Sequence, residues 1–326
     1  MASRRDQNSF DVAVVGAGFA GMYMLYRLRS LGLSAVVLEA GGGVGGTWYW
    51  NRYPGARCDV ESMEYSYQFS EALQQEWEWS ERYAAQPEIL EYANHVADRF
   101  DLRRDIRFDT RVLAIRFDDR ENAWEITTQH GPINASFCVM ATGCLSSPNR
   151  PEFPGANLFG GDVYHTGLWP HEPVDFTSKR VAVIGTGSSA VQSIPIIAQA
   201  ADHLFVFQRT PNYAVPAHNH LLDPTYRQAI KADYPALRAR AKLNATGIDF
   251  DYSERLALET PDQERRREYE SRWHRGGLSF LGAFMDIMVD DEANKTAADF
   301  VRAKIRRTVR DHEVADIARR RETDDQ

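Results

Sequence analysis

The sequence predicts an α/β protein with two parallel-sheet units, followed by a mainly helical C-terminal region. Two segments, 11–38 and 181–207, share one pattern: an apolar run, a glycine-rich turn, a helix-compatible stretch and a second apolar run. Short apolar runs bounded by glycine are typical of buried strands. From about residue 223, Glu, Arg, Lys and Ala dominate and glycine is scarce, which favours helices.

The individual elements follow from local pattern. In the two repeated segments we expect strands at Asp11–Val15, Ala35–Leu38, Val181–Ile184 and Leu204–Phe207, with helices reaching about Ser30 and Ala200. Between the segments, Glu76–Arg99 is largely helix-like, with Pro87 starting a second helix. Alternation predicts antiparallel strands around Arg107–Phe117 and Ala123–Thr128, closing on the run Ser136–Ala141. Pro148, Pro151 and Pro154 indicate a linker.

These elements predict three regions: 1–150 and 151–222, each with one dinucleotide-type unit, and a helical region 223–326. The second unit would have only about two strands, which is thin for a doubly wound sheet. We therefore expect the fold to be incomplete.

Composition limits the possible functions. Among 326 residues, 43% are hydrophobic and 26% charged, with a net charge of −8, so nucleic acid and anionic lipid are not expected partners. The apolar stretch Leu278–Val289 is short and contains Asp286, so no membrane span is expected. Cys58, Cys138 and Cys144 are too few and too irregular for a disulfide framework; no metal site is expected, and reduced thiols indicate a cytoplasmic protein.

The first glycine turn has the context of a dinucleotide-binding fingerprint. Gly16, Gly18 and Gly21 follow a strand and open a helix, and Glu39 stands about 20 residues on. Gly16 permits the tight turn, Gly18 lets backbone N–H groups approach a pyrophosphate, and Gly21 allows close packing of helix on strand. Glu39 would accept hydrogen bonds from ribose hydroxyls and repel a 2′-phosphate, so this turn suits FAD or NAD.

The second turn differs at its ribose end. Its segment reads Gly185, Thr186, Gly187, Ser188, Ser189, Ala190, and we place Arg209 at the position equivalent to Glu39. A guanidinium there favours NADP, because it binds a 2′-phosphate with two parallel hydrogen bonds. A surface arginine is the alternative interpretation. Together the turns predict a flavin reduced by NADPH; the absence of a CxxC disfavours a disulfide reductase.

Further motifs resemble one family, the Baeyer–Villiger monooxygenases. Its fingerprint FxGxxxHxxxW, followed by Pro or Asp, is matched by Phe159, Gly161, His165, Trp169 and Pro170. The stretch 45–62 and the Ala-Thr-Gly at 141–143 also resemble the family. The resemblance covers essentially the whole chain, most specifically 11–70 and 141–216.

The resemblance assigns roles by position. It implies that the FAD site includes Glu39, Thr47, Trp48, Tyr65 and Val112, while Arg57, Cys58 and Asp59 border both the flavin and the nicotinamide. It places the NADP pyrophosphate on Thr186 to Gln192, and the 2′-phosphate on Arg209 and Thr210. His165 and Trp169 would be hinge residues between domains, with a hydrogen-bonded structural histidine as the simpler interpretation of His165.

The implied reaction uses NADPH and O2 to convert a ketone to an ester or lactone through a C4a-peroxyflavin. Asp59 matches the family's catalytic aspartate, which holds an arginine beside the flavin. That arginine follows the helical region in the family and lies beyond this sequence, so the chain resembles a truncated N-terminal portion, and activity of this chain alone is doubtful.

Two other functions stay open: an N- or S-oxygenating flavin monooxygenase, and a truncated nucleotide-binding protein without catalysis. Trp169 and Pro170 argue against the first. The ketone and the oligomeric state are not predicted.

Overall fold

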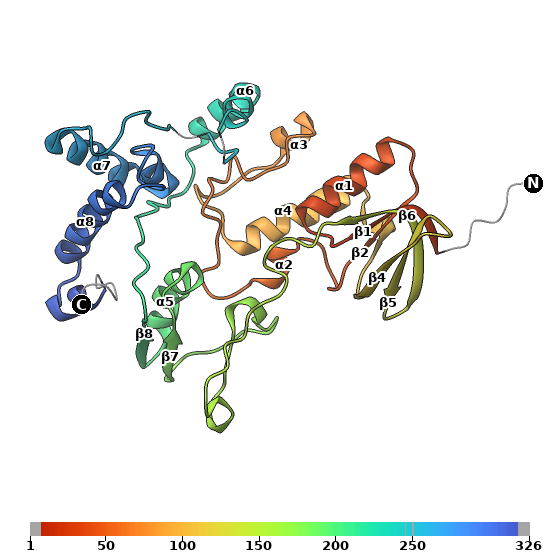
Figure 1. The fold of residues 1–326 in the computed structure, drawn as a ribbon, viewed down its shortest axis with the longest axis horizontal. Coiled ribbons are helices and arrows are strands. Elements are labelled where there is room, and N and C mark those ends of the chain that lie inside the picture. The colour runs from red at the N-terminus through yellow and green to blue at the C-terminus, as the bar shows by residue number, and fades with distance from the viewer. Residues whose placement is uncertain (1–7, 245, 250, 319–326) are drawn as a thin grey trace, which may run out of the picture. The chain divides into compact units, whose positions relative to one another are not determined.

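The computed structural model describes residues 8–244, 246–249 and 251–318 (Figure 1). Contacts divide the chain into two compact units: unit 1 comprises Met1–Tyr53 and Gln86–Val174, and unit 2 comprises Pro54–Ala85 and Asp175–Gln326. These boundaries differ from the regions expected from the sequence, because residues 54–85 make their contacts with the second unit.

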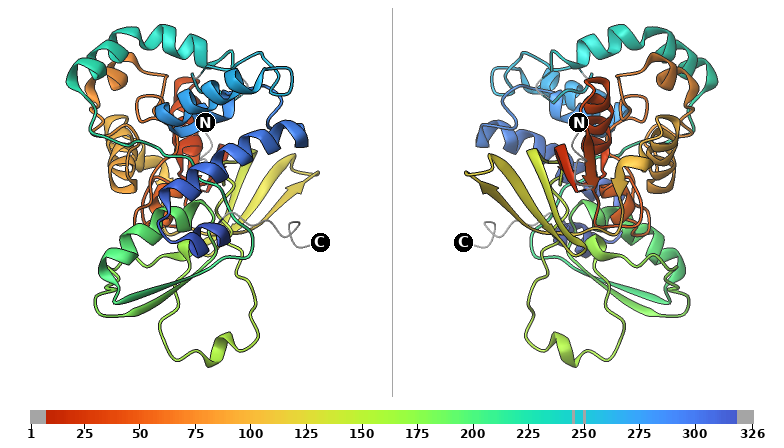
Figure 2. Two further views of the ribbon diagram at one scale, coloured as in Figure 1. Left: turned by 90° about the vertical axis from the view of Figure 1, so that its left-hand side faces the viewer. Right: turned by 90° about the vertical axis from the view of Figure 1, so that its right-hand side faces the viewer.

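Unit 1 contains a six-stranded sheet in the order β3-β2-β1-β6-β5-β4. Its strands are β1 (Ser9–Val15), β2 (Ala35–Leu38), β3 (Ile106–Arg107), β4 (Val112–Asp118), β5 (Ala123–Thr128) and β6 (Gly131–Met140). The β1 strand pairs in parallel with β2 and β6, while β4–β5 and β5–β6 are antiparallel; Figure 2 shows β4 to β6 as neighbouring arrows. The expected α/β class and its antiparallel extension are confirmed.

Helices cover one face of this sheet. Val12 and Val14 of β1 share a buried cluster with Met22 and Leu25 of α1 (Phe19–Ser30) and with Ala93 of α4 (Gln86–Arg99). A second cluster forms around residues of opposite strand parity, including Ala13, Val36, Ile126 and Ile133. This alternation follows from the two-residue period of a strand. A short helix, α2 (Thr47–Trp50), follows the glycine-rich loop after β2.

The expectation of a largely helical stretch over Glu76–Arg99 is wrong in its first part. Helix α3 (Glu71–Glu76) ends where that stretch begins, and α4 starts at Gln86, one residue before Pro87. The intervening backbone instead forms bridges between Arg57 and Ala85 and between Glu81 and Leu221. Trp79 and Tyr83 are buried there, so tertiary packing outweighs local helix propensity.

Unit 2 contains the second strand-turn-helix-strand segment. Strands β7 (Arg180–Ile184) and β8 (His203–Phe207) form a two-stranded parallel sheet, joined by α5 (Ser188–Ala200). The connection confirms the predicted pattern. Ile184 and Phe207 are exposed, at 68% and 58%, because the described residues provide no further strand or layer over them.

The C-terminal region is helical, as expected. It contains α6 (Pro224–Ala241), α7 (Asp262–Arg275), α8 (Asp291–Thr308) and α9 (His312–Ile317). Tyr269 of α7 packs against Phe280 and Phe284, and this cluster extends to Val301 of α8. Four 3-10 turns complete the described elements: η1 (Arg103–Asp105), η2 (Ala156–Leu158), η3 (Thr166–Leu168) and η4 (Gly277–Gly282).

The helices in the described part of the chain are all too short or too polar to cross a membrane.

Gly21 provides a test of how α1 packs on β1. A Cβ at this position would lie 1.9 Å from the Gly16 carbonyl oxygen, whereas a Cβ at Gly18 would meet nothing closer than Gly46 Cα at 3.5 Å. We expect Gly21→Ala to destabilise the protein by about 1–3 kcal/mol or more, because backbone must move. Gly18→Ala is the matched control, and in flavin-free protein it should melt near the wild-type temperature. Equal melting temperatures by circular dichroism for Gly21→Ala and wild type would contradict the packing.

Candidate functional site

The first glycine turn lies at the carboxyl end of β1. Gly16 has φ +102°, and its N–H donates to the Leu38 carbonyl over 2.8 Å. A Cβ on Gly16 would lie 2.6 Å from the Ala141 oxygen, and one on Gly46 would lie 2.8 Å from Gly18 Cα. The backbone is therefore as close-packed as the fingerprint requires, with glycine at each point of approach.

Glu39 follows β2 directly and its carboxylate faces this turn. The side chain is 5% exposed; Oε2 accepts from the Ala17 N–H at 2.7 Å and Oε1 accepts from the Gly41 N–H at 2.8 Å. Each carboxylate oxygen has a further lone pair. The structure thus places Glu39 beside the turn, where a ribose hydroxyl could donate to it.

Thr47 and Trp48 reach the same turn through the glycine-rich loop. The Gly45 N–H donates to the Ala17 carbonyl at 3.0 Å, and the Trp48 N–H donates to Gly45. Val112 opens β4, two residues after Thr110, whose N–H donates to the Glu39 carbonyl at 2.8 Å. Unit 1 therefore brings this subset of the predicted flavin residues to one end of its sheet.

The second turn repeats the geometry of the first. Gly185 has φ +101°, and its N–H donates to the Phe207 carbonyl at 2.8 Å, as Gly16 does to Leu38. A Cβ on Gly185 or Gly187 would meet nothing within 4 Å. The turn is open where a ligand would approach.

The register corrects one prediction. Ile184 pairs with Phe207 as Val15 pairs with Leu38, so Gln208, and not Arg209, is the counterpart of Glu39. The Thr186 hydroxyl donates to Gln208 Oε1 at 3.4 Å, paralleling the contact of Ala17 with Glu39. Sequence reasoning missed Gln208, which counting one residue from the last strand position would have found.

Arg209 and Thr210 lie one and two residues farther out and are exposed. Among the described residues, nothing forms a hydrogen bond or ion pair with the Arg209 guanidinium. It is therefore available to a phosphate outside the ribose position.

The helices that follow the two turns begin without a side-chain cap, as α2 and α7 also do. Helices α1 and α5 begin after Gly18 and Gly187, with no side-chain cap and no acidic residue in the first turn. By contrast, α6, α8 and α9 are capped by Asp223, Asp290 and Asp311. The first N–H groups of a helix need an acceptor and attract anions. Each of these helix starts therefore offers free N–H groups to the pyrophosphate of one dinucleotide.

Arg57, Cys58 and Asp59 lie in unit 2, together with Tyr65. The Arg57 guanidinium donates to Glu81 Oε2 at 2.8 Å and to the Tyr83 carbonyl at 2.9 Å. Arg57 is thus already paired with Glu81. Tyr65 is half-buried, and its N–H donates to the Glu61 carbonyl at 3.0 Å.

Among the described residues, Asp59 has no cationic partner. In the described part of the chain, its carboxylate accepts one side-chain hydrogen bond, from Gln192 Nε2 at 3.3 Å. The residue is exposed at a pocket wall, yet the surrounding protein displaces enough water to raise the pKa of its carboxyl group, and the bond from Gln192 partly opposes this. The carboxylate would be stabilised by a positive group beside it.

Gln192 contacts unit 2 residues on both sides of Cys58. Its Oε1 accepts from the Arg57 N–H at 3.3 Å, and its Nε2 donates to the Arg57 carbonyl at 3.2 Å. Ser188, Ser189 and Ala190 form the first turn of the same helix.

The fingerprint residues lie in unit 1. His165 Nδ1 accepts from the Gly167 N–H at 3.1 Å, and Nε2 lies 3.1 Å from the Asn149 carbonyl oxygen. The Trp169 ring lies 5.4 Å from that of Tyr164. Phe159 is 64% exposed, and a Cβ at Gly161 would lie 2.8 Å from its ring; Pro170 follows Trp169. These two contacts hold the His165 ring within its own segment of unit 1.

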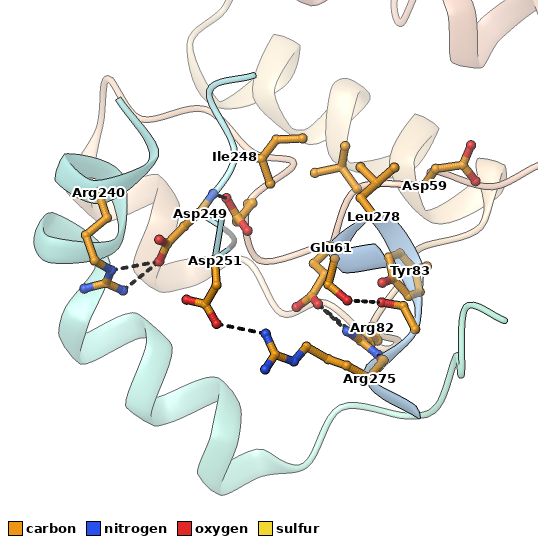
Figure 3. Close-up of a pocket in the computed structure, with 14 residues that line it drawn as sticks. Asp59, Glu61, Arg82, Tyr83, Arg240, Ile248, Asp249, Asp251, Arg275 and Leu278 are labelled. Carbon is orange, nitrogen blue, oxygen red and sulfur yellow. Dashed lines mark hydrogen bonds and ion pairs between the residues drawn. The ribbon is translucent and has the colours of Figure 1, made fainter. Parts of the chain in front are cut away.

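A pocket of about 380 Å³ opens beside Asp59 in unit 2 (Figure 3). Ion pairs form much of its wall: Arg82 with Glu61 at 2.7 Å, Arg240 with Asp249 at 2.8 Å and Arg275 with Asp251 at 2.9 Å. Ile248, Leu278 and Tyr83 also line it.

One more carboxyl group lines this pocket. Glu64 Oε2 accepts from the Asp249 N–H at 2.7 Å, and burial raises the pKa of Glu64.

No cluster of three or more potential metal ligands occurs within residues 8–244, 246–249 and 251–318.

The chain matches a family model of pyridine-nucleotide enzymes and is similar to several monooxygenases. Residues 13–274 match the family model described as pyridine nucleotide-disulphide oxidoreductase. The chain is 42% identical over 311 residues to a Baeyer–Villiger monooxygenase of Pseudooceanicola batsensis, covering 94% of this chain and 57% of that protein. It is 41% identical over 311 residues to an acetone monooxygenase (methyl acetate-forming) of Gordonia sp. strain TY-5, covering 95% and 58%.

Two further matches bear on function. A phenazine N-monooxygenase of Lysobacter antibioticus is 41% identical over 314 residues, covering 95% of this chain and 58% of that protein. A solved structure of oxidized steroid monooxygenase bound to NADP has 53% identity and a TM-score of 0.92, covering 96% and 60%. The chain therefore spans about three fifths of the length of the relatives it matches.

The reactivity of Cys58 tests whether its thiol is buried in unit 2 as the structure shows. Burial raises the pKa of its thiol to about 11, so at pH 8 about one molecule in a thousand carries the reactive thiolate. In a protein carrying Cys138→Ala and Cys144→Ser, we expect Cys58 alkylation by iodoacetamide to rise with pH without a plateau below pH 10. Mass spectrometry would follow it, with urea-unfolded protein as the control; a plateau near pH 8 would contradict the buried environment.

Proposed function

Because this chain belongs to the Baeyer–Villiger monooxygenase family, we propose that it binds FAD and NADPH and takes part in the oxidation of a ketone to an ester or lactone. The overall reaction balances as ketone, O2, NADPH and H⁺ giving ester, water and NADP⁺. The observation that carries the proposal is the pair of uncapped helices, one beside the Glu39 carboxylate and the other near the Arg209 guanidinium.

FAD, when bound, supplies the redox and oxygen chemistry, and NADPH supplies the hydride. Unit 1 fits FAD because Gly16, Gly18 and Gly21 leave the start of α1 bare, and Glu39 can accept from ribose hydroxyls. Thr47 and Trp48 would line the flavin side of the same turn. A 2′-phosphate would be repelled by the Glu39 charge.

Unit 2 fits NADPH because Gly185 and Gly187 leave space at the start of α5. Gln208 faces the turn at the ribose position and carries no charge that would repel phosphate. Arg209 and Thr210 would hold the 2′-phosphate, since the guanidinium is exposed and unengaged within the described residues.

Asp59 would hold a cation close to the reacting atoms. A positive group there stabilises negative charge that develops as a ketone is attacked, and it also keeps the Asp59 carboxylate ionised. Neither Arg57 nor Arg82 does this in the described chain, because Glu81 and Glu61 bind them. We therefore propose that this chain alone binds both cofactors, and that ketone turnover needs a cation supplied from outside the described residues.

The pocket beside Asp59 is the proposed ketone side of the site. Ile248 and Leu278 give it an apolar portion, and the paired charges around them keep the wall polar without free cations in the described lining. The match to a steroid monooxygenase at 53% identity supports a substrate with an apolar framework.

N-oxygenation is the second candidate. It is favoured by the phenazine N-monooxygenase, whose 41% identity equals that of the acetone monooxygenase. Oxygen transfer to a ring nitrogen needs no attack on a carbonyl, so products separate the two functions.

Coenzyme discrimination tests the role of Arg209. We expect Arg209→Ala to weaken NADPH binding about 10- to 100-fold, because a charge-assisted pair with the 2′-phosphate is lost. NADH binding should stay unchanged. Arg180→Ala, at the opposite end of the same sheet, is the control and should leave both affinities unchanged. Equal weakening of NADPH and NADH by Arg209→Ala, measured by fluorescence titration, would refute the assignment.

The activity test starts with the purified chain and FAD. We expect yellow protein after desalting, with close to one FAD per chain. In a second step, the part of a relative that this chain does not match is supplied as a second polypeptide. With ¹⁸O2, NADPH and a panel of ketones, this mixture should then form ¹⁸O-labelled ester. Gas chromatography–mass spectrometry would detect the ester. Colourless protein would contradict the cofactor proposal, and N-oxides without esters would establish the second candidate instead.

A further inference from the structure

The side chain of Gln192 binds the segment 55–59 to helix α5 within unit 2. One amide group forms two hydrogen bonds with the Arg57 backbone, through Oε1 at 3.3 Å and Nε2 at 3.2 Å. The same Nε2 lies 3.3 Å from Asp59 Oδ1. The donor and acceptor of this amide are therefore both used, on the two residues that flank Cys58.

Close packing and backbone hydrogen bonds also hold the segment 55–59 in place. Gly55 has φ +78°, and a Cβ there would lie 2.3 Å from the Gln192 carbonyl oxygen and 3.2 Å from Ile196 Cγ1. On its other side, Arg57 forms a bridge with Ala85, and the Cys58 N–H donates to the Ala84 carbonyl at 3.1 Å. The segment is thus held between α5 and residues 84–85.

Few groups compete with Gln192 for Asp59. The ionisable neighbours are Cys58 and Tyr83, while Glu61 and Arg82 pair with each other on the same pocket wall and Arg57 pairs with Glu81. In the described chain, Gln192 is the one side chain that donates a hydrogen bond to this carboxylate. The orientation of Asp59 consequently depends on a residue of the helix whose first turn is the proposed pyrophosphate site.

We propose that Gln192 is a positioning residue: it holds the Arg57–Asp59 segment against α5 and orients the Asp59 carboxylate, linking that group to the coenzyme helix. Only the link to NADP⁺ rests on the proposed function. The contact of Gln192 with the Arg57–Asp59 segment, which we call the clamp, is a property of unit 2 alone. It also differs from direct contact with the coenzyme pyrophosphate, because the amide is engaged by protein groups.

The experiment measures exposure of Cys58 in the Cys138→Ala, Cys144→Ser protein with 4,4′-dithiodipyridine, which reacts over a wide pH range. We expect Gln192→Leu to react about tenfold faster or more, because the lost hydrogen bonds allow local opening. Gln199→Leu, a substitution of an exposed glutamine on the same helix, is the matched control and should react like the parent. Equal rates for the two substitutions would overturn the proposal.

Gln192→Glu separates the hydrogen-bonding role of Gln192 from its packing role, because glutamate has nearly the same shape as glutamine and differs in its hydrogen-bonding groups. Near pH 4, just below the usual pKa of a glutamate, more than half of the introduced carboxyl is protonated and can donate to Asp59, and the neighbouring carboxylate favours the protonated form further; at pH 8 the introduced carboxyl is ionised and repels Asp59. We expect Cys58 reactivity closer to that of the parent at pH 4 and raised reactivity at pH 8, relative to Gln199→Leu at each pH. A rate ratio independent of pH would reduce Gln192 to a packing role and overturn the proposal, even if Gln192→Leu folds poorly.

The last part of the experiment tests the link between Gln192 and the coenzyme site. Saturating NADP⁺ should slow Cys58 modification in the parent and not in Gln192→Leu, with binding of NADP⁺ to both proteins verified by titration. If NADP⁺ binds both proteins and protects Cys58 in both, the link through Gln192 is wrong. If NADP⁺ binds neither the parent nor the variant, the proposed function fails, and the pH-dependent result still decides the clamp.

Discussion

The structure of unit 1 depends on how closely the start of α1 approaches the end of β1. The Gly21 position lies so near the Gly16 carbonyl that no side chain fits between helix and strand. This approach sets the direction in which α1 leaves the sheet, and it brings the helix start, the Glu39 carboxylate and the loop before α2 to one edge. A binding site at that edge follows from packing of backbone on backbone, which side-chain chemistry then completes.

Much of this could be predicted from local sequence. The glycine turns, their strands and the C-terminal helices were predictable because each is specified by short-range pattern: apolar runs, glycine spacing and helix-forming composition. The position of Gln208 was predictable in the same way, because Gln208 directly follows the expected strand Leu204–Phe207 as Glu39 follows Ala35–Leu38, and the register of β7 with β8 agrees. The extended segment 77–85 escaped prediction, because its partners, near residues 57–62 and 220–222, are distant in sequence.

Charge pairing organises the region around Asp59 in unit 2. Arg57, Arg82, Arg240 and Arg275 each have an acidic partner, so the described residues here include several cations and yet place none beside Asp59. Arg57 is close to Asp59 in sequence, but in the structure its guanidinium pairs with Glu81. The number of arginines near a motif therefore does not indicate which of them pairs with its carboxylate. Because these four arginines are paired with acidic residues, the proposed function requires a different positive group beside Asp59.

The bare starts of α1 and α5 have a thermodynamic consequence. Helices that the chain leaves without acceptors for their first N–H groups are incomplete until a phosphate provides them. Ligand occupancy then becomes part of folding stability through mass action, with each saturating dinucleotide adding to the resistance of its own unit to unfolding.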